Sequence, residues 1–257
     1  MEAFLLKLLV TPALVGAASL AGRRWGAAVS GWVVGIPLTS GPIAFFLALD
    51  PGVHFAADAS VAILAGTVSQ AAFALAYAWT GMRFAWPACL AASTVAFFGA
   101  TWVLDLFRLD GAPTFLLAVC ALVTTMILMP KVRHDREPAS PLPWWDIPAR
   151  MLVATVFVIG LTYAAPLLGA RLAGLLAPFP LYAAVLAVFA HRLQSEAAAV
   201  AVLRGLLLGL FAFAGFFLSL STLLVTQGIV VAFAAAIAVA LVAQSASLFA
   251  GRRWQLA

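Results

Sequence analysis

The chain has 257 residues, of which 65% are hydrophobic and only 9% are charged. A soluble domain carries about 25% charged residues, so this sequence lacks the polar side chains to cover a water-exposed surface, and we expect lipid to be its solvent. The net charge of +5 does not indicate a nucleic-acid binder, because the basic residues lie at the ends of apolar runs and do not cluster on one face.

Nine apolar stretches are each near the roughly 20 residues that a helix needs to cross a bilayer. Most of the positive charge near the N-terminus follows the first stretch, which favours a membrane span over a cleaved leader. Tryptophans near the span ends, Trp32 among them, predict an interfacial aromatic belt. The sequence predicts an all-α polytopic membrane protein with nine transmembrane helices, at about residues 3–21, 26–49, 56–80, 84–104, 113–130, 148–168, 172–190, 197–222 and 226–249.

Nine spans divide the basic residues unequally between the two sides of the membrane. Ten Lys and Arg fall on the side of the C-terminus, and only Lys7, Arg108 and Arg171 fall on the side of the N-terminus. Basic loops stay in the cytoplasm. We therefore expect the N-terminus outside and the C-terminus in the cytoplasm.

The span at 26–49 is interrupted by glycine and proline, and the span at 172–190 has a similar interruption. Proline removes a backbone donor and frees a carbonyl, and such breaks persist at membrane depth where protein or a water-filled cavity pairs the freed groups. The alternative is a kinked helix that its neighbours seal. The candidate substrate-binding residues at these two breaks are Pro37, Thr39, Ser40, Gly41, Pro42, Pro178, Pro180 and Tyr182.

Two registers reveal an internal repeat. A shift of 143 residues aligns Gly31 with Gly174 and Pro37 with Pro180, and a shift of 139 aligns Gly66 with Gly205. These matches predict two four-helix repeats, spans 1–4 and 6–9, linked by span 5. The odd number of spans before the second copy inverts it in the membrane, as in many transporters. The predicted segments are 1–110 for the first repeat, 111–147 for span 5 and a cytoplasmic loop, and 148–257 for the second repeat.

The stretch from Ala173 to Glu196 contains Ala-Gly-Leu, Phe-Pro and Ala-His, ending in His191-Arg-Leu-Gln-Ser-Glu. It resembles the GlpM family of small inner-membrane proteins, which are chains of about four spans, and the first half resembles that family more weakly and lacks the histidine. The resemblance implies two fused GlpM-like units in a bacterial inner membrane, with a link to exopolysaccharide production.

Several polar residues inside or beside the spans are further candidates. Arg204 lies two turns into its span, where an ionisable group points to function, although a long arginine can also reach the membrane surface. It is a candidate to bind an anionic group or to pair with Glu196. Gln70 is a candidate substrate-binding residue, and both it and Gln244 are expected to bond to other helices. His191, Glu196 and Asp58 are candidates for a proton relay, while Glu196 and Asp58 also suit a helix N-terminus.

The sequence contains no hydrolase, oxidoreductase or metal-ligand motif, so we expect no enzyme, no cofactor and no bound metal. The first hypothesis is a transporter or exporter that moves a small solute by alternating access at a midplane site between spans 2 and 7. The alternatives are a non-transporting inner-membrane scaffold of envelope or exopolysaccharide assembly, and a lipid flippase or scramblase. The expected partners are membrane lipids, an unidentified small solute, and either a second copy of the chain or an envelope-assembly protein.

Overall fold

The fold is given by a computed structural model, which describes residues 2–37, 40–49, 52–107, 110–131, 143–157, 159–160 and 178–254. The part of the chain that it describes is helical and contains no strand, which confirms the all-α prediction. Within the described ranges, four helices are long and apolar enough to cross a membrane, and they indicate a membrane-embedded protein. They are α4 (Val53–Gly81), α5 (Trp86–Asp105), α6 (Gly111–Leu128) and α9 (Glu196–Trp254).

The other helices fall within or near the remaining predicted spans. They are α1 (Glu2–Trp25), α2 (Ala27–Val34), α3 (Ser40–Leu49) and α8 (Leu181–Leu193), and residues 146–157 are also helical. The span predicted at 26–49 is therefore two helices, because α2 ends at Val34, Pro37 is not helical and α3 begins at Ser40. Residues 172–177 of the span predicted at 172–190, including Gly174, lie outside the described residues.

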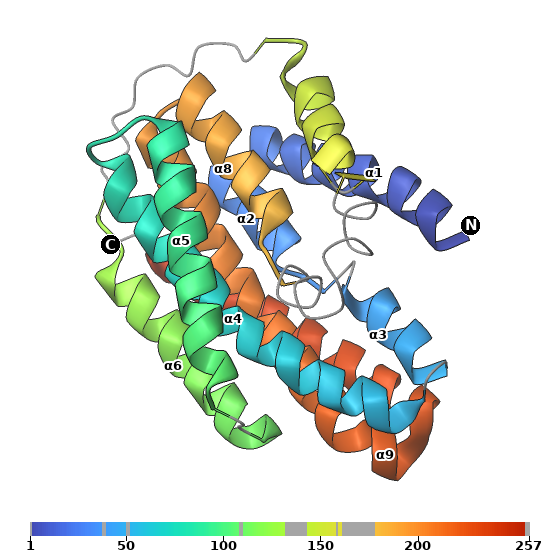
Figure 1. Cartoon of the computed structure of the whole chain (residues 1–257). Helices are drawn as coiled ribbons and strands as arrows, with labels where there is room; N and C mark the ends of the chain where they lie inside the picture. Colours follow the sequence, from blue (N-terminus) through green and yellow to red (C-terminus); the bar gives the residue numbers. More distant parts are fainter. Residues whose placement is uncertain are drawn as a thin grey trace.

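Gly228 divides α9 into two parts. Its backbone has φ 75° and ψ 173°, a conformation that glycine adopts without steric cost and other residues rarely adopt. The chain reverses there, so residues 196–227 and 229–254 form an antiparallel pair, as the lower right of Figure 1 shows. This division matches the boundary between the two last predicted spans.

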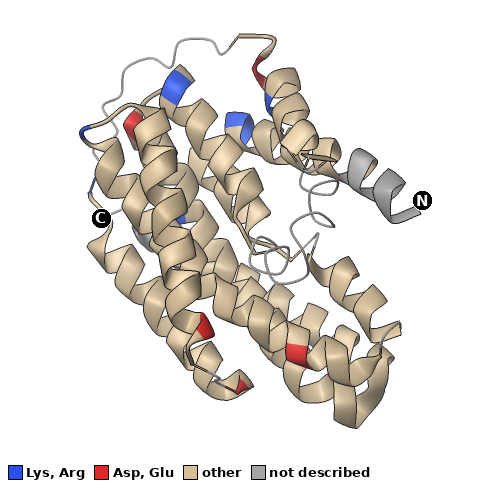
Figure 2. Cartoon of the chain, in the orientation of Figure 1, with Lys and Arg blue, Asp and Glu red and all other residues tan. Residues whose placement is uncertain are grey.

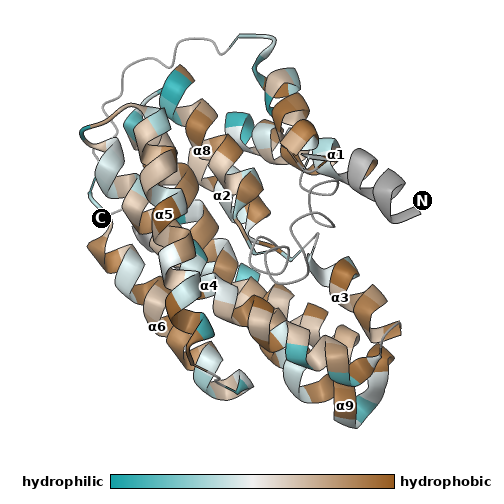
Figure 3. Ribbon diagram, viewed as in Figure 1, coloured by the Kyte–Doolittle hydropathy of each residue, from teal (hydrophilic) through white to brown (hydrophobic). Residues whose placement is uncertain are grey.

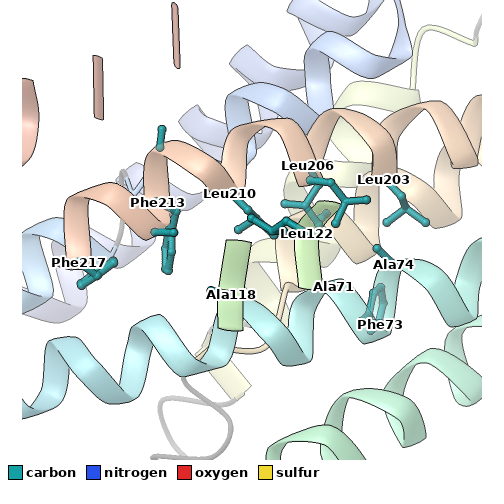
Figure 4. Packing of buried hydrophobic residues seen from close by; sticks show 14 of the residues in the cluster. Ala71, Phe73, Ala74, Ala118, Leu122, Leu203, Leu206, Leu210, Phe213 and Phe217 are labelled. Carbon is teal, nitrogen blue, oxygen red and sulfur yellow. The ribbon is translucent and has the colours of Figure 1, made fainter. Parts of the chain in front are cut away.

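Helix α4 lies at the centre of the molecule, in contact with α5, α6 and α9 (Figure 1). Alanines of α4 and α6 face leucines and phenylalanines of α9, such as Ala71, Ala118, Leu206 and Phe213, in one continuous core (Figure 4). Small residues on one helix leave room for large ones on its neighbour. This core draws residues from all three predicted segments, so the segments do not pack as separate units.

Hydrophobic residues run along all the helices in Figure 3, and many of the large ones are exposed on the outer faces. Val95 is 72% exposed on α5, Ile127 is 65% exposed on α6 and Val242 is 71% exposed on α9. A water-soluble protein rarely exposes contiguous apolar surface on this scale. The exposed faces are suited to contact with lipid chains.

Basic residues are concentrated at one end of the bundle (Figure 2), where the acidic residues Asp146 and Glu196 also lie. The ends of α1, α4, α6 and α8 carry Arg23, Arg24, Arg83, Lys131 and Arg192, and we name this the basic end. Asp58, Asp105 and Asp110 lie at the opposite end, where α4 begins and α5 connects to α6. Arg108, in that connection, lies outside the described residues.

Candidate functional site

The first break, between α2 and α3, frees a backbone carbonyl that another helix binds. In a continuous helix the carbonyl of Trp32 would accept the Ile36 N–H, but Ile36 donates to Val33 instead, at 3.3 Å. The side-chain amide of Gln244 donates to the Trp32 carbonyl at 3.2 Å. The expected bond from Gln244 to another helix is thus confirmed, and it compensates the break.

Trp32 makes a second contact with the last part of α9. Its indole Nε1 donates to the Ser247 hydroxyl at 3.1 Å. Ser247 in turn donates to the Gln244 carbonyl at 2.9 Å. The indole N–H of Trp32 therefore joins α2 to the last part of α9, and its place in an interfacial belt stays a prediction.

Four glycines bring the backbones of α2 and α9 together. A Cβ at Gly31 would overlap the carbonyl oxygen of Val202, and a Cβ at Gly205 would overlap the carbonyl oxygen of Ala28. One turn further along, a Cβ at Gly35 would lie 2.6 Å from the Cα of Gly209. The two Gly-x-x-x-Gly motifs therefore face each other, and each needs the absence of a side chain on the other.

The residues that follow the first break are only partly described. Pro37 is buried, and its carbonyl accepts the Gly41 N–H at 2.9 Å as α3 begins. A Cβ at Gly41 would lie 3.4 Å from the ring of Phe216. Ser40 is half-buried and Pro42 is exposed. Thr39 lies outside the described residues.

The second break, before α8, packs against α4. A Cβ at Gly66 would lie 2.5 Å from the Cβ of Pro178. The ring of Phe179 stands edge-on to the rings of Phe73 and Phe97, with centroids 5.7 and 5.3 Å apart. Pro180 is buried, and its carbonyl accepts the Ala184 N–H at 2.8 Å. The second break therefore packs against an aromatic part of the core.

Gln70 lies on the face of α4 that meets this second break. It follows Gly66 by one turn, and residues four apart share a helix face. Its side chain is only 6% exposed. The expected bond from Gln70 to another helix does not form within the part of the chain that the structure describes. A buried amide can both donate and accept, so Gln70 is the polar side chain available at the second break.

Tyr182 lies against α1. Its hydroxyl is 3.1 Å from the hydroxyl oxygen of Thr11, and it packs against a small cluster of Val15, Ala154 and Val185. The phenol therefore joins α1 to α8, and its single polar atom already has a partner.

Arg204 lies beside the end of α6. Its Nη2 donates to the carbonyl of Pro130 at 2.9 Å. A cation near the C-terminus of a helix is stabilised by the helix dipole, which explains this position. The expected ion pair with Glu196 does not form, since the ion pairs among the described residues join only Arg23, Asp146 and Arg150.

Of the candidates for a proton relay, His191 and Glu196 lie near each other at the basic end, and Asp58 lies at the opposite end. His191 lies one residue past the predicted span, with Nδ1 3.4 Å from the Tyr77 hydroxyl. Burial lowers the pKa of the His191 imidazole, and the charge of Glu196 acts in the opposite direction. Glu196 lies in the first turn of α9, as expected. Asp58 lies in the second turn of α4, because that helix begins at Val53, so its predicted place at a helix start is wrong.

One buried polar group was not predicted from the sequence. Asp146, 1% exposed, accepts Arg150 Nε at 2.7 Å and Arg23 Nη2 at 3.2 Å. The guanidinium of Arg150 also lies 5.3 Å from the ring centroid of Phe189. The spacing of Asp146 and Arg150, one helical turn apart, was the available signal. This group joins the end of α1 to the helix at residues 146–157.

The chain was compared with protein-family models, with curated proteins and with solved structures, and none of them matches it. The resemblance to the GlpM family therefore stays a prediction, and the argument for function depends on the geometry of the two breaks.

Proposed function

We propose that this protein is a nine-span transporter of the bacterial inner membrane that moves a small solute by alternating access between its two broken helices. The observation that carries the proposal is the break between α2 and α3. There the Trp32 carbonyl has lost its partner within the helix and accepts a hydrogen bond from Gln244 of another helix. Transport sites commonly form where membrane helices are discontinuous, because the freed backbone groups can bind solutes and ions.

The proposal includes two inverted repeats, spans 1–4 and 6–9. Two contacts related by the repeat support this arrangement. Gly205 in the second repeat packs on α2 of the first, and its counterpart Gly66 in the first repeat packs on Pro178 of the second. Each broken span therefore lies against the third span of the other copy. Exchange of such contacts between two copies is how inverted repeats alternate access.

The proposed orientation places the N-terminus outside and the basic end in the cytoplasm. Arg83 and Lys131 lie at one end of the bundle and Asp105 at the other, a distribution that agrees with the positive-inside rule. The solute site would use Gln70, Pro178 and the backbone around Pro37 and Ser40. Because none of these groups is charged, the expected solute is neutral and polar.

A second candidate function is a scaffold that does not transport. The close approach of Gly66 to Pro178, and of Gly31 to Val202, favours it, because tightly packed breaks leave little room for a solute. The resemblance to GlpM proteins would then imply a subunit of exopolysaccharide assembly.

A binding screen tests both candidates. The purified protein would be heated with uncharged sugars, amino acids, monovalent cations and lipids, and its unfolding midpoint measured. We expect a neutral polar solute to raise the midpoint, and Gln70→Leu to abolish that shift. The matched control is Gln194→Leu, at an exposed residue between α8 and α9. A stabilising solute would then be tested for flux into proteoliposomes. Absence of any stabilising solute, together with co-purification of a partner protein, would contradict transport and support the scaffold.

A further inference from the structure

The C-terminal end of α6 gathers hydrogen-bond donors from two neighbouring helices. Trp79 of α4 donates through Nε1 to the Leu128 carbonyl at 3.0 Å. Arg204 of α9 donates to the Pro130 carbonyl at 2.9 Å. The last carbonyls of a helix have no partner within it and carry partial negative charge. The first bond satisfies the last carbonyl of α6, the second binds a carbonyl two residues past the helix, and both donors therefore lie at the end of α6.

The basic side chains at this end of α6 are not neutralised by acidic residues that the structure describes. The guanidinium of Arg204 has five N–H donors, and its Nε is buried without an acceptor among the described residues. Lys131 directly follows Pro130, and Arg83 lies one turn beyond Trp79; both are exposed. Neither these two nor Arg204 takes part in an ion pair within the described structure. We name Trp79, Arg83, Lys131 and Arg204 the α6 corner.

The expected position of the α6 corner, at the level of the lipid headgroups, favours a lipid as its ligand. Trp79 is 56% exposed at the basic end, and tryptophans at such positions lie at the level of lipid headgroups. Below it on α6, Ile127 is 65% exposed and Leu128 is 51% exposed, and they present apolar surface for acyl chains. A free phosphate ion would use the charges but not this apolar surface.

We propose that the α6 corner binds the phosphate of an anionic glycerophospholipid. The lipid headgroup accepts from Arg204, Lys131 and Arg83, and its chains lie along α6. Clusters of basic residues next to membrane helices recognise anionic lipids in this way. The proposal does not depend on transport, since a scaffold in the same membrane would present the same corner.

Native mass spectrometry of the purified full chain tests this site. The protein would be mixed with phosphatidylglycerol, with phosphatidylcholine, or with inorganic phosphate, and the bound fraction measured. We expect phosphatidylglycerol to be retained in preference to the other two. In the double variant Arg83→Gln/Lys131→Gln its affinity should fall about 25-fold, because each basic residue near an anionic lipid surface contributes roughly fivefold. Both residues are exposed, so the unfolding midpoint without added lipid should not change.

The matched control is Arg24→Gln. Arg24 is an exposed cation at the same end, but its guanidinium lies 5.5 Å from the ring centroid of Trp25 and not at the α6 corner. We expect this variant to bind phosphatidylglycerol as the unaltered protein does. An equal loss in Arg24→Gln would overturn the proposal, because it would show attraction by the basic end as a whole. Equal retention of phosphatidylcholine or of inorganic phosphate would overturn it as well.

Discussion

At the residue scale, polar groups inside this apolar chain are used to connect helices. Asp146 binds two arginines, and Gln244 binds the backbone of Trp32. Neither partner can be read from the sequence, because composition indicates that a polar residue is buried but does not indicate which helix it meets. The prediction for Gln244 named the kind of contact correctly. For Arg204 the sequence indicated a charge within a span, and its actual acceptor, Pro130, lies 74 residues away.

We expect the negative charge of Asp146 to stabilise the buried guanidinium of Arg150. Asp146→Asn would leave the Arg150 guanidinium, only 4% exposed, without a negative partner. Removing one partner of a buried ion pair costs about 3–5 kcal/mol, so the unfolding midpoint should fall strongly. Arg23→Gln removes the more exposed partner, 33% exposed, and keeps the inner pair, so its effect should be much smaller. Equal destabilisation by the two variants would mean that the buried pair of Asp146 and Arg150 contributes no more to stability than the contact with Arg23.

The bond from Gln244 to the Trp32 carbonyl can be tested by itself. Hydrogen bonds between membrane helices average about 0.6 kcal/mol, so Gln244→Leu should lower the free energy of unfolding modestly, by about 0.5–2 kcal/mol. Chemical denaturation in detergent measures this. Ser245→Ala is the control, because Ser245 is exposed and bonds only within its own helix, to the Leu241 carbonyl. A loss in Gln244→Leu no larger than in the control would argue against the repair of the break.

At the element scale, the pattern of apolar runs predicted the helices better than their contacts. The break near Pro37 and the reversal near Gly228 follow from residues that disturb a helix locally. The contact between α2 and α9 cannot be predicted in this way. A stripe of glycines such as Gly31 and Gly35 indicates a close helix contact, but it does not indicate that the partner is the stripe of Gly205 and Gly209. The alignment drew attention to Gly205 only as a counterpart of Gly66.

The contact between α2 and α9 makes a clear prediction for glycine. Gly205→Val would place methyl groups where the Ala28 carbonyl lies. Overpacking costs at least about 1–3 kcal/mol, and here the obstacle is backbone, so we expect severe loss of folded protein in size-exclusion chromatography. The control is Gly99→Val on α5, where nothing lies within 4 Å of an added Cβ. If the variant at Gly205 behaved like that control, the close contact of α2 and α9 would be wrong.

At the scale of the whole molecule, the concentration of basic residues at one end predicts the proposed orientation in the membrane. Reporter proteins fused after Arg83 and after Lys131 should lie in the cytoplasm, and one fused after Asp105 should lie outside. Green fluorescent protein, which fluoresces in the cytoplasm, and alkaline phosphatase, which is active outside it, would report the two sides. Fluorescence from the fusion after Asp105 would contradict the orientation, and fluorescence from all three fusions would also contradict the nine-span topology on which the inverted repeat depends.

The bond between Trp32 and Gln244 also has a consequence for biosynthesis. The two residues are 212 positions apart, and a ribosome adds about 5–20 residues per second, so α2 is made about 10–40 s before its donor. Throughout that interval its open carbonyl has to stay in contact with water or with the insertion machinery, since lipid offers no donor. A chain that ends before Gln244 never completes this bond, so the break in its first half stays without the donor that the finished protein supplies.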